Sequence, residues 1–311
     1  MMRRRRAGFS LVELIVATVV ATLLGAGIIG VLSRQQKFYR AATEMLGVRA
    51  QLRDGAEVLA ADIRGAAVAT FGVPLMSDSA IELITLIGSS VLCSAPSGAS
   101  VMLPPRTLAS GNTLTSLLAV PDTGDIAIIY AAGTEPPDTA TWETHRIATF
   151  APASLTTSCP PSTGFTTDGD IGSDGYVVTL ADTAVASVRA GAPIRFLRRV
   201  RYSLYRSSDA KWYLGYRRCN AIGVSSCGTV QPVSGPYMPY TGPGATETGI
   251  SFRYYDQSGA TLGAGLPGNT LARVDIVLKG QSASEVRLAG DARTLYRDSA
   301  IVTVSPRNRL R

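Results

Sequence analysis

Few side chains in this sequence are arranged for catalysis. Its single histidine, His145, lies in a strand-like segment beside Trp142, and GxSxG, HExxH and Walker A sequences do not occur. One histidine excludes a metal site with two histidine ligands, and no CxxC spacing suggests zinc. Catalysis by a serine, a lysine or a pair of aspartates has no fixed sequence pattern, so the sequence does not exclude these mechanisms. We expect a protein that is not an enzyme and holds no cofactor.

Three carboxylates lie close together in a glycine-rich stretch, at Asp168, Asp170 and Asp174. Oxygen ligands of this kind suit calcium, but the stretch lacks the distal glutamate of an EF-hand loop because position 179 is Thr179. Asp and Gly are also the usual residues of a solvated turn. We therefore predict a turn without a metal ion, with these three aspartates as weak calcium candidates.

The four cysteines all lie beyond the uncharged apolar run that ends at Leu32, at Cys93, Cys159, Cys219 and Cys227. An even number of cysteines in an exported domain favours disulfides. Seven residues separate Cys219 from Cys227, so a local bridge is the simplest of the three possible connectivities. Cys93 and Cys159 would then join two long loops.

Glu13 is an isolated acid at the start of a long apolar run, because Leu14 to Leu32 contain no charged residue. From Phe9 to Leu32 a helix would measure about 36 Å, enough for a hydrocarbon layer of about 30 Å. An ionisable group costs roughly 2.5 to 3.5 kcal/mol at mid-bilayer and less near the edge. Such a group therefore normally needs a partner of opposite charge. Alternatively, Glu13 reaches the headgroups alone.

The charge distribution predicts an orientation. Lys and Arg outnumber Asp and Glu by 30 to 23, but removing Arg3 to Arg6 lowers the net charge from +7 to +3. This basic cluster holds its end of the helix in the cytoplasm by the positive-inside rule, so Ser33 onward should lie outside it. The full chain is 46% hydrophobic and 17% charged, which excludes wholesale disorder. Its basic excess lies mostly in the Arg3 to Arg6 cluster and so does not indicate a general nucleic-acid binder.

The start of the chain resembles a known processing signal. Arg6-Ala-Gly8 followed by Phe9-Ser-Leu-Val-Glu13-Leu-Ile-Val-Ala is similar to the prepilin N-terminal methylation motif of type IV pilins and type II secretion pseudopilins. The resemblance implies that prepilin peptidase, a membrane aspartyl peptidase, cuts between Gly8 and Phe9 and N-methylates Phe9. It also implies that the leader is lost, the apolar helix is kept, and Glu13 pairs with an N-terminal amine during filament entry.

One long helix must carry this motif. After Leu32 the sequence becomes polar, but apolar residues recur at steps of three or four to about residue 67, and the two halves together reach on the order of 85 Å. Ala17, Ala21 and Gly25 recur every four residues, which suits close helix packing, although an ordinary membrane helix explains this spacing equally well. We divide the chain into a leader (1–8), a transmembrane or filament-core helix (9–32), an amphipathic half-helix (33–70) and a β-rich periplasmic head (71–311).

The head is predicted from short apolar runs separated by Gly, Pro, Ser and Thr. Long polar connections are expected around 92–120, 132–142, 151–174 and 220–248. The fold class is therefore α+β, a long N-terminal helix packed on a β-rich, pilin-like head. The predicted strands are Ile81 to Ile87, Asp125 to Ala131, Thr144 to Phe150, Tyr176 to Leu180, Ile194 to Tyr205, Trp212 to Arg217, Ile250 to Tyr255, Leu271 to Leu278 and Ala300 to Val304.

The head also resembles W-type minor pilins and, more loosely, J-type pseudopilins. The segments that carry this resemblance are Ala61 to Ala66, Gly124 to Tyr130, Arg199 to Arg206, Ile250 to Asp256 with Ser258-Gly259, Leu271 to Leu278 and Pro306 to Asn308. The presence of Glu13 differs from the K-type tip pseudopilin, which lacks an acid there. The head is longer than typical J-type heads, which argues against a J-type pseudopilin. Because W-like and J-like features overlap, the sequence does not separate a type IV pilus from a type II secretion system.

These features predict a minor pilin or pseudopilin of the bacterial inner membrane that helps to initiate or cap a filament. Its expected partners are prepilin peptidase, major and minor pilin or pseudopilin subunits and the inner membrane assembly platform. Rival functions are a filament-displayed module for adhesion or DNA uptake, and a signal-anchored periplasmic protein that never polymerises. We do not expect a nucleic-acid partner, although aromatic and basic residues alternate on one pair of strands: Arg199, Arg201, Tyr202, Tyr205, Arg206, Trp212, Tyr213, Tyr216, Arg217 and Arg218.

Overall fold

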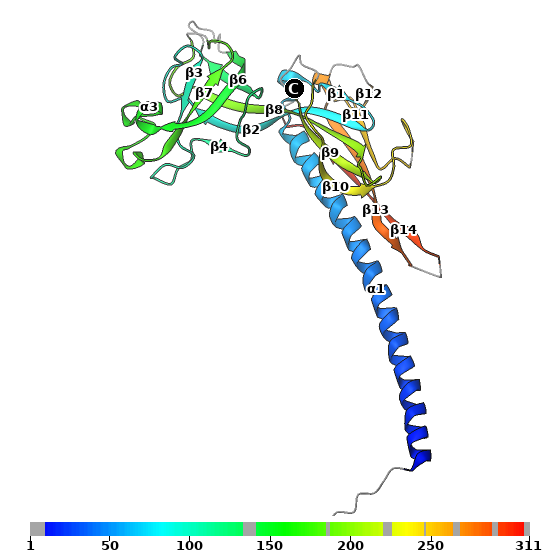
Figure 1. Ribbon diagram of the computed structural model, residues 1–311. Helices are drawn as coiled ribbons and strands as arrows, with labels where there is room; N and C mark the ends of the chain where they lie inside the picture. Colours follow the sequence, from blue (N-terminus) through cyan, green and yellow to red (C-terminus); the bar gives the residue numbers. More distant parts are fainter. Residues whose placement is uncertain are drawn as a thin grey trace, which may run out of the picture.

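A computed structural model describes residues 10–132, 141–184, 187–219, 226–245, 247–263, 268–287 and 292–307. It contains one long helix and an antiparallel β head (Figure 1), so the predicted α+β class is confirmed. In chain order the elements are α1 (Leu11–Gly65), α2 (Val68–Phe71), β1 (Leu75–Met76), β2 (Ala80–Val91), β3 (Ser100–Leu103), β4 (Ser116–Leu117), β5 (Ile126–Ala131), β6 (Thr141–Ser154), α3 (Leu155–Ser158), η1 (Pro161–Thr163), η2 (Asp168–Asp170), β7 (Asp174–Leu180), β8 (Pro193–Arg206), β9 (Trp212–Cys219), β10 (Gln231–Tyr237), β11 (Ile250–Tyr255), β12 (Thr261–Leu262), η3 (Gly268–Thr270), β13 (Arg273–Val286) and β14 (Thr294–Val304).

Helix α1 is continuous from the apolar run into the head. No proline interrupts it, and its backbone ends at Gly65, where the amide of Ala66 donates to the carbonyl of Ile63. Its buried positions begin at Ala41 and follow one face at helical spacing, through Ala41, Val48, Leu52, Gly55, Leu59, Ala60 and Ile63. The outward half of α1 therefore belongs to the head, while the first half extends beyond it (Figure 1).

Two long strands, β2 and β8, form the frame of the head. They pair along almost their whole length, from Ala80 opposite Ser203 to Val91 opposite Pro193. Strand β9 joins the free edge of β8 at one end and β5 joins it at the other. The β2–β8 ribbon therefore runs through two lobes, a proximal lobe on α1 and a distal lobe that projects away from the helix (Figure 1).

The proximal lobe contains β8 to β14 and packs on α1. Its core joins Leu52, Leu59 and Ile63 of the helix to strand residues such as Leu83 and Ile276. Strand β13 approaches α1 closely at Gly280, where a Cβ would lie 3.0 Å from both Gln51 and Val48. The hydrophobic effect holds the helix to the sheet, since each Å2 of apolar surface buried contributes on the order of 25 cal/mol.

The distal lobe is the segment inserted between β2 and β8. It has its own core, which includes Leu103, Ile129, Ile147 and Phe196, and its strands are ordered β5-β6-β7-β3 from the ribbon outward. At the waist between the lobes, β2 bulges next to Gly88, where a Cβ would lie 2.7 Å from the Leu117 side chain of β4.

Part of the loop prediction was wrong. The expected connection at 92–120 contains β3 and β4, and the one at 220–248 contains β10. Residues 151–174 contain the end of β6 and three short helical turns, whereas most of 132–142 lies outside the described residues. Strand β10 has the sequence Gln-Pro-Val-Ser-Gly-Pro-Tyr, in which Pro and Gly mask the strand pattern, and pairing with β9 and β13 overrides that local signal.

Candidate functional site

The first half of α1 is bare. Every described residue from Ser10 to Leu24 and from Ala26 to Arg40 is exposed, and the helix is long and apolar enough to cross a membrane by length and composition. The hydroxyls of Thr18 and Thr22 donate to the carbonyls of Ile15 and Val19 at 2.9 and 2.8 Å. Since their polar groups are satisfied within the helix, these threonines suit an apolar surrounding.

Glu13 lies in the first turn of α1. Ser10 caps the helix, and its Oγ accepts a hydrogen bond from the backbone amide of Glu13 at 3.2 Å. Its side chain is exposed in the first turn of α1, where an acidic residue interacts favourably with the helix dipole. The predicted cleavage residues Gly8 and Phe9 lie outside the described residues, so the structure does not place an N-terminal amine relative to Glu13.

Polar contacts fix where the head sits on α1. The side-chain amide of Gln51 donates to the carbonyls of Pro236 and Gln281 at 2.8 and 3.2 Å. The Tyr237 hydroxyl donates to the Gln51 carbonyl at 3.1 Å and lies 2.7 Å from Ser234 Oγ. These contacts place β10 and β13 directly over the middle of the outward half-helix.

A second polar contact lies near the helix end. The Tyr202 hydroxyl of β8 donates to Asp62 Oδ2 at 2.6 Å. Burial raises the pKa of Asp62, and the hydrogen bond from Tyr202 opposes this increase. Burial, together with the nearby Asp62 carboxylate, also raises the pKa of Tyr202. The pair therefore ties α1 to the β2–β8 ribbon through a strong hydrogen bond.

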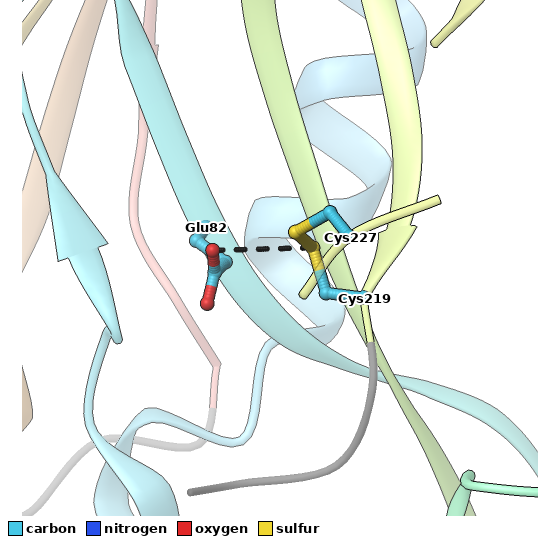
Figure 2. A group of neighbouring side chains, drawn as sticks. All are labelled: Glu82, Cys219 and Cys227. Carbon is cyan, nitrogen blue, oxygen red and sulfur yellow. Dashed lines mark hydrogen bonds between the residues drawn. A yellow bond between two sulfur atoms is a disulfide. The ribbon is translucent and has the colours of Figure 1, made fainter. Parts of the chain in front are cut away.

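Strand β2 carries a buried acid that is held by two arginines of β8. Glu82 of β2 is fully buried and pairs with Arg199, and with Arg201 at 2.6 Å, both from β8. It also faces the disulfide between Cys219 and Cys227 (Figure 2), with Oε2 4.0 Å from Cys219 Sγ. Among the described residues, Glu82, Cys219 and Cys227 are the one group with three ligand-type atoms within 4.8 Å of one another. It is a poor metal site because bonded sulfurs are not thiolates.

A second buried acid, Asp125, lies beside β8. Arg198 donates from Nη2 to Asp125 Oδ2 at 2.7 Å and from Nε to Oδ1 at 3.0 Å. Arg218 of β9 contacts Asp125 Oδ1 at 3.2 Å and Asp122 Oδ2 at 2.6 Å. This ion pair lowers the pKa of Asp122, chiefly through the hydrogen bond from Arg218. Several arginines of the aromatic and basic stripe are thus paired within the head.

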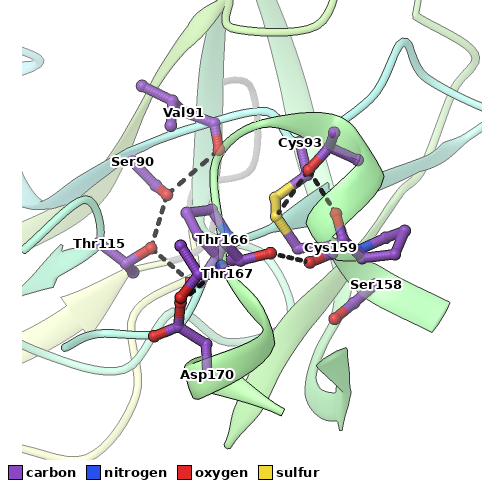
Figure 3. Close-up of a disulfide and its surroundings, with 12 residues drawn as sticks. Ser90, Val91, Cys93, Thr115, Ser158, Cys159, Thr166, Thr167 and Asp170 are labelled. Carbon is purple, nitrogen blue, oxygen red and sulfur yellow. Dashed lines mark hydrogen bonds between the residues drawn. A yellow bond between two sulfur atoms is a disulfide. The ribbon is translucent and has the colours of Figure 1, made fainter. Parts of the chain in front are cut away.

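The distal disulfide joins Cys93 to Cys159 across 66 residues (Figure 3). Both pairs in the structure are those favoured by the spacing. Next to the Cys93–Cys159 bridge, Asp170 is buried and accepts hydrogen bonds from the backbone of Ala109, and from the backbone and hydroxyl of Thr167 at 2.7 and 2.8 Å. The Ala109 amide contributes most to lowering the pKa of Asp170.

The three aspartates do not converge. Asp168 and Asp174 are exposed, and the buried Asp170 carboxylate serves as a clamp between two loops of the distal lobe. Sequence reasoning missed this role because Ala109 is distant in sequence. It also missed the surroundings of His145, whose Nδ1 lies 3.0 Å from Asp182 Oδ1 and whose Nε2 lies 3.2 Å from Glu143 Oε2.

Comparison with known proteins adds one result. Comparison with curated proteins and with solved structures gave no significant match. Residues 3–29 match the model of the prokaryotic N-terminal methylation motif. This match, the bare apolar half of α1 and the α+β head make the chain consistent with a type IV pilin-like protein, a structural subunit that carries the substrate motif of prepilin peptidase.

Proposed function

We propose that this chain is a minor pilin or pseudopilin that helps to initiate or cap a type IV pilus or a type II secretion pseudopilus. Prepilin peptidase removes residues 1–8 and methylates Phe9. Residues 9–32 then hold the subunit in the bacterial inner membrane, with the head on the periplasmic side. The assembly platform transfers it from the membrane to the filament, where major and minor subunits surround the helix.

The division of α1 carries this proposal. Its outward half is covered by the head through residues such as Leu59 and Ile63, whereas its apolar first half is exposed along the described part of the chain. A bare helix of this kind needs a lipid or helical surrounding. The methylation motif on the same helix favours both surroundings, one after the other: first the lipid of the membrane, and then a bundle of helices from other pilin-like subunits. The glycines at 25, 27 and 30 have open space where a Cβ would lie, which permits close helix contacts.

Glu13 supplies the polar element of this assembly. Glu13 is the fourth residue after Phe9, whose backbone nitrogen would become a free amine on cleavage. In an apolar surrounding, the carboxylate and the methylated amine would each stabilise the charge of the other. A pair formed within one chain or between neighbouring chains would set the axial position of the new subunit.

A processing assay tests the proposal. The chain is expressed with prepilin peptidase, and its N-terminal mass is measured in the membrane and in sheared filaments. We expect loss of residues 1–8 and a methylated Phe9 in the wild type, and an intact leader in Gly8→Ala. Glu13→Ala should be processed normally but should be depleted from filaments, with Ser10→Ala as a control that keeps the carboxylate. Equal processing of wild type and Gly8→Ala would reject the proposal.

The distal lobe favours a second candidate function, a filament-displayed binding module. It has its own core and disulfide and projects away from the helix that would lie in the filament (Figure 1). Leu118 and Val120 are 82% and 62% exposed on the 116–120 segment of this lobe. If display is the function, Leu118→Ser with Val120→Ser should reduce surface adhesion or DNA uptake while filament number is unchanged. If the subunit acts only in filament initiation, the same variant should keep normal adhesion and normal DNA uptake.

A further inference from the structure

Basic residues gather where α1 leaves its apolar run. Arg34, Lys37 and Arg40 lie on the helix, while Arg287 directly follows β13 and Arg293 directly precedes β14 of the β13–β14 hairpin. Figure 1 shows this hairpin extending along α1 toward its N-terminal half. Lys37, Arg40, Arg287 and Arg293 line one surface hollow of about 380 Å3. We call these five residues the basic collar.

The collar lies at the height of a lipid headgroup layer. At a rise of about 1.5 Å per residue, Arg34, Lys37 and Arg40 stand roughly 3, 8 and 12 Å beyond Leu32. The headgroup region of a bilayer adds about 5 to 8 Å to each side of the hydrocarbon core. Arginine and lysine side chains near the ends of membrane helices extend toward that region, so all three cations can reach it.

Two aromatic residues mark the same level. Phe38 and Tyr39 are 70% and 67% exposed, and their rings meet edge to face with centroids 6.1 Å apart. Tyrosine is enriched at membrane interfaces because its ring is apolar and its hydroxyl is polar. An exposed aromatic pair between Lys37 and Arg40 therefore suits the boundary between lipid and water.

The collar has a strong excess of positive charge. The hollow is lined by four cations and a single acid, Glu285. Glu44, the nearest acid on the helix, is already engaged by the hairpin, since its carboxylate accepts hydrogen bonds from the backbone amide of Ala283 at 3.0 Å and from the Ser284 hydroxyl. The net charge of the collar therefore attracts an anionic partner.

We propose that the basic collar binds the anionic phosphate headgroups of phospholipids in the leaflet through which α1 leaves the membrane. The contact holds the β13–β14 hairpin, and with it the head, on the membrane surface until the subunit enters a filament. This inference rests on the proposed function, because it requires residues 9–32 to span the bilayer. Each basic residue near an anionic surface adds about 1 kcal/mol, or roughly a fivefold gain in association.

Lipid selectivity of the full chain tests the proposal. The protein is reconstituted in phosphatidylcholine vesicles, and spin-labelled phosphatidylglycerol or phosphatidylcholine is added to measure the fraction of each that is immobilised beside the protein. We expect phosphatidylglycerol to be enriched several-fold beside the wild type. The enrichment should fall as salt shortens the screening length from about 10 Å at 0.1 M to about 3 Å at 1 M.

A matched pair of variants separates the collar from general charge. The quadruple variant Lys37→Gln, Arg40→Gln, Arg287→Gln and Arg293→Gln should lose most of the enrichment. The control removes four exposed cations elsewhere on the head, by Arg146→Gln, Arg189→Gln, Arg206→Gln and Arg253→Gln, and should keep it.

Three outcomes are decisive. Equal immobilisation of both lipids by the wild type overturns the collar proposal, as would happen if the collar binds acidic residues of another subunit. Equal loss in both variants also overturns it. Resistance of the protein to carbonate extraction from the same vesicles tests insertion separately: an extracted chain contradicts the membrane-spanning function, whereas an inserted chain without lipid selectivity contradicts only the collar.

Discussion

Replacement of Gly55 by alanine tests how α1 is fixed to the head. A Cβ at this position would lie 2.3 Å from the Tyr237 hydroxyl and 2.8 Å from Ser234 Oγ. Tyr237 is fully buried, and its hydroxyl bonds to the Gln51 carbonyl and to Ser234. The tyrosine cannot simply move toward solvent, so Gly55→Ala must displace it from both hydrogen bonds.

The expected loss of stability follows from three terms. Overpacking of a buried site costs typically 1 to 3 kcal/mol. The two displaced hydrogen bonds contribute about 0.5 to 1.5 kcal/mol each. Alanine gains about 1 kcal/mol over glycine in helix propensity, which offsets part of the loss. We therefore expect Gly55→Ala to lower the free energy of unfolding by about 1 to 5 kcal/mol, with a central value of about 3 kcal/mol.

Denaturant unfolding of the full chain in detergent, followed by tryptophan fluorescence, measures this change. Gly47→Ala is the matched control, because Gly47 is exposed on the same helix with nothing within 4 Å of its Cβ position, and it should gain up to about 1 kcal/mol from helix propensity. Tyr237→Phe removes the clashing oxygen and leaves Cζ 3.5 Å from the Gly55 Cβ position, so the double variant should be more stable than the two single changes predict. If Gly55→Ala is as stable as Gly47→Ala, the reasoning is refuted.

Three further predictions concern the head. Glu82→Gln should lower the free energy of unfolding by about 3 to 5 kcal/mol, since it leaves two arginines without their buried acid, and thermal unfolding would reveal this. Because the pKa of Asp170 is lowered in the folded protein, its carboxylate contributes stability above the unfolded pKa and loses that contribution as pH falls through the folded pKa; melting temperatures from neutral to acidic pH should therefore fall less steeply in Asp170→Asn than in the wild type. Replacing Cys93 and Cys159 by serine should destabilise the distal lobe by about 2 to 4 kcal/mol, measurable as earlier proteolysis of that lobe; an unchanged cleavage rate would contradict it.

Sequence periodicity was enough to predict the regular part of the fold. The helical pattern to about residue 67 matches an α1 that ends at Gly65, and all nine predicted strands overlap observed strands. Strands β3 and β10 were missed for different reasons. The four residues of β3 are too short for a clear alternation, and β10 contains two prolines and a glycine. Both are defined by their partners in the sheet, which local sequence does not specify.

The side-chain clusters of the head could be predicted less well. Glu82 stands in an apolar strand, and its partners Arg199 and Arg201 are more than a hundred residues away. Arginines and tyrosines alternate in this part of the sequence, but that pattern does not reveal the buried acid that the register of β2 against β8 places opposite Arg201. Asp170 was likewise predicted only as a turn residue, because its partner Ala109 lies 61 residues away in sequence. Such pairs depend on long-range register, which no local pattern encodes.

The polar contacts on α1 fix its axial position on the sheet, which its apolar stripe alone does not determine. Apolar residues that recur at every turn would pack almost as well after a slide of one turn, about 5.4 Å, along the sheet. Such a slide would leave the Gln51 amide and the Asp62 carboxylate without the partners at Pro236 and Tyr202. It would also move Gly55 away from Tyr237 and place a larger side chain against the buried phenol. Each displaced polar group would cost about 1 to 3 kcal/mol, so together they select a single register and make the head and helix move as one body.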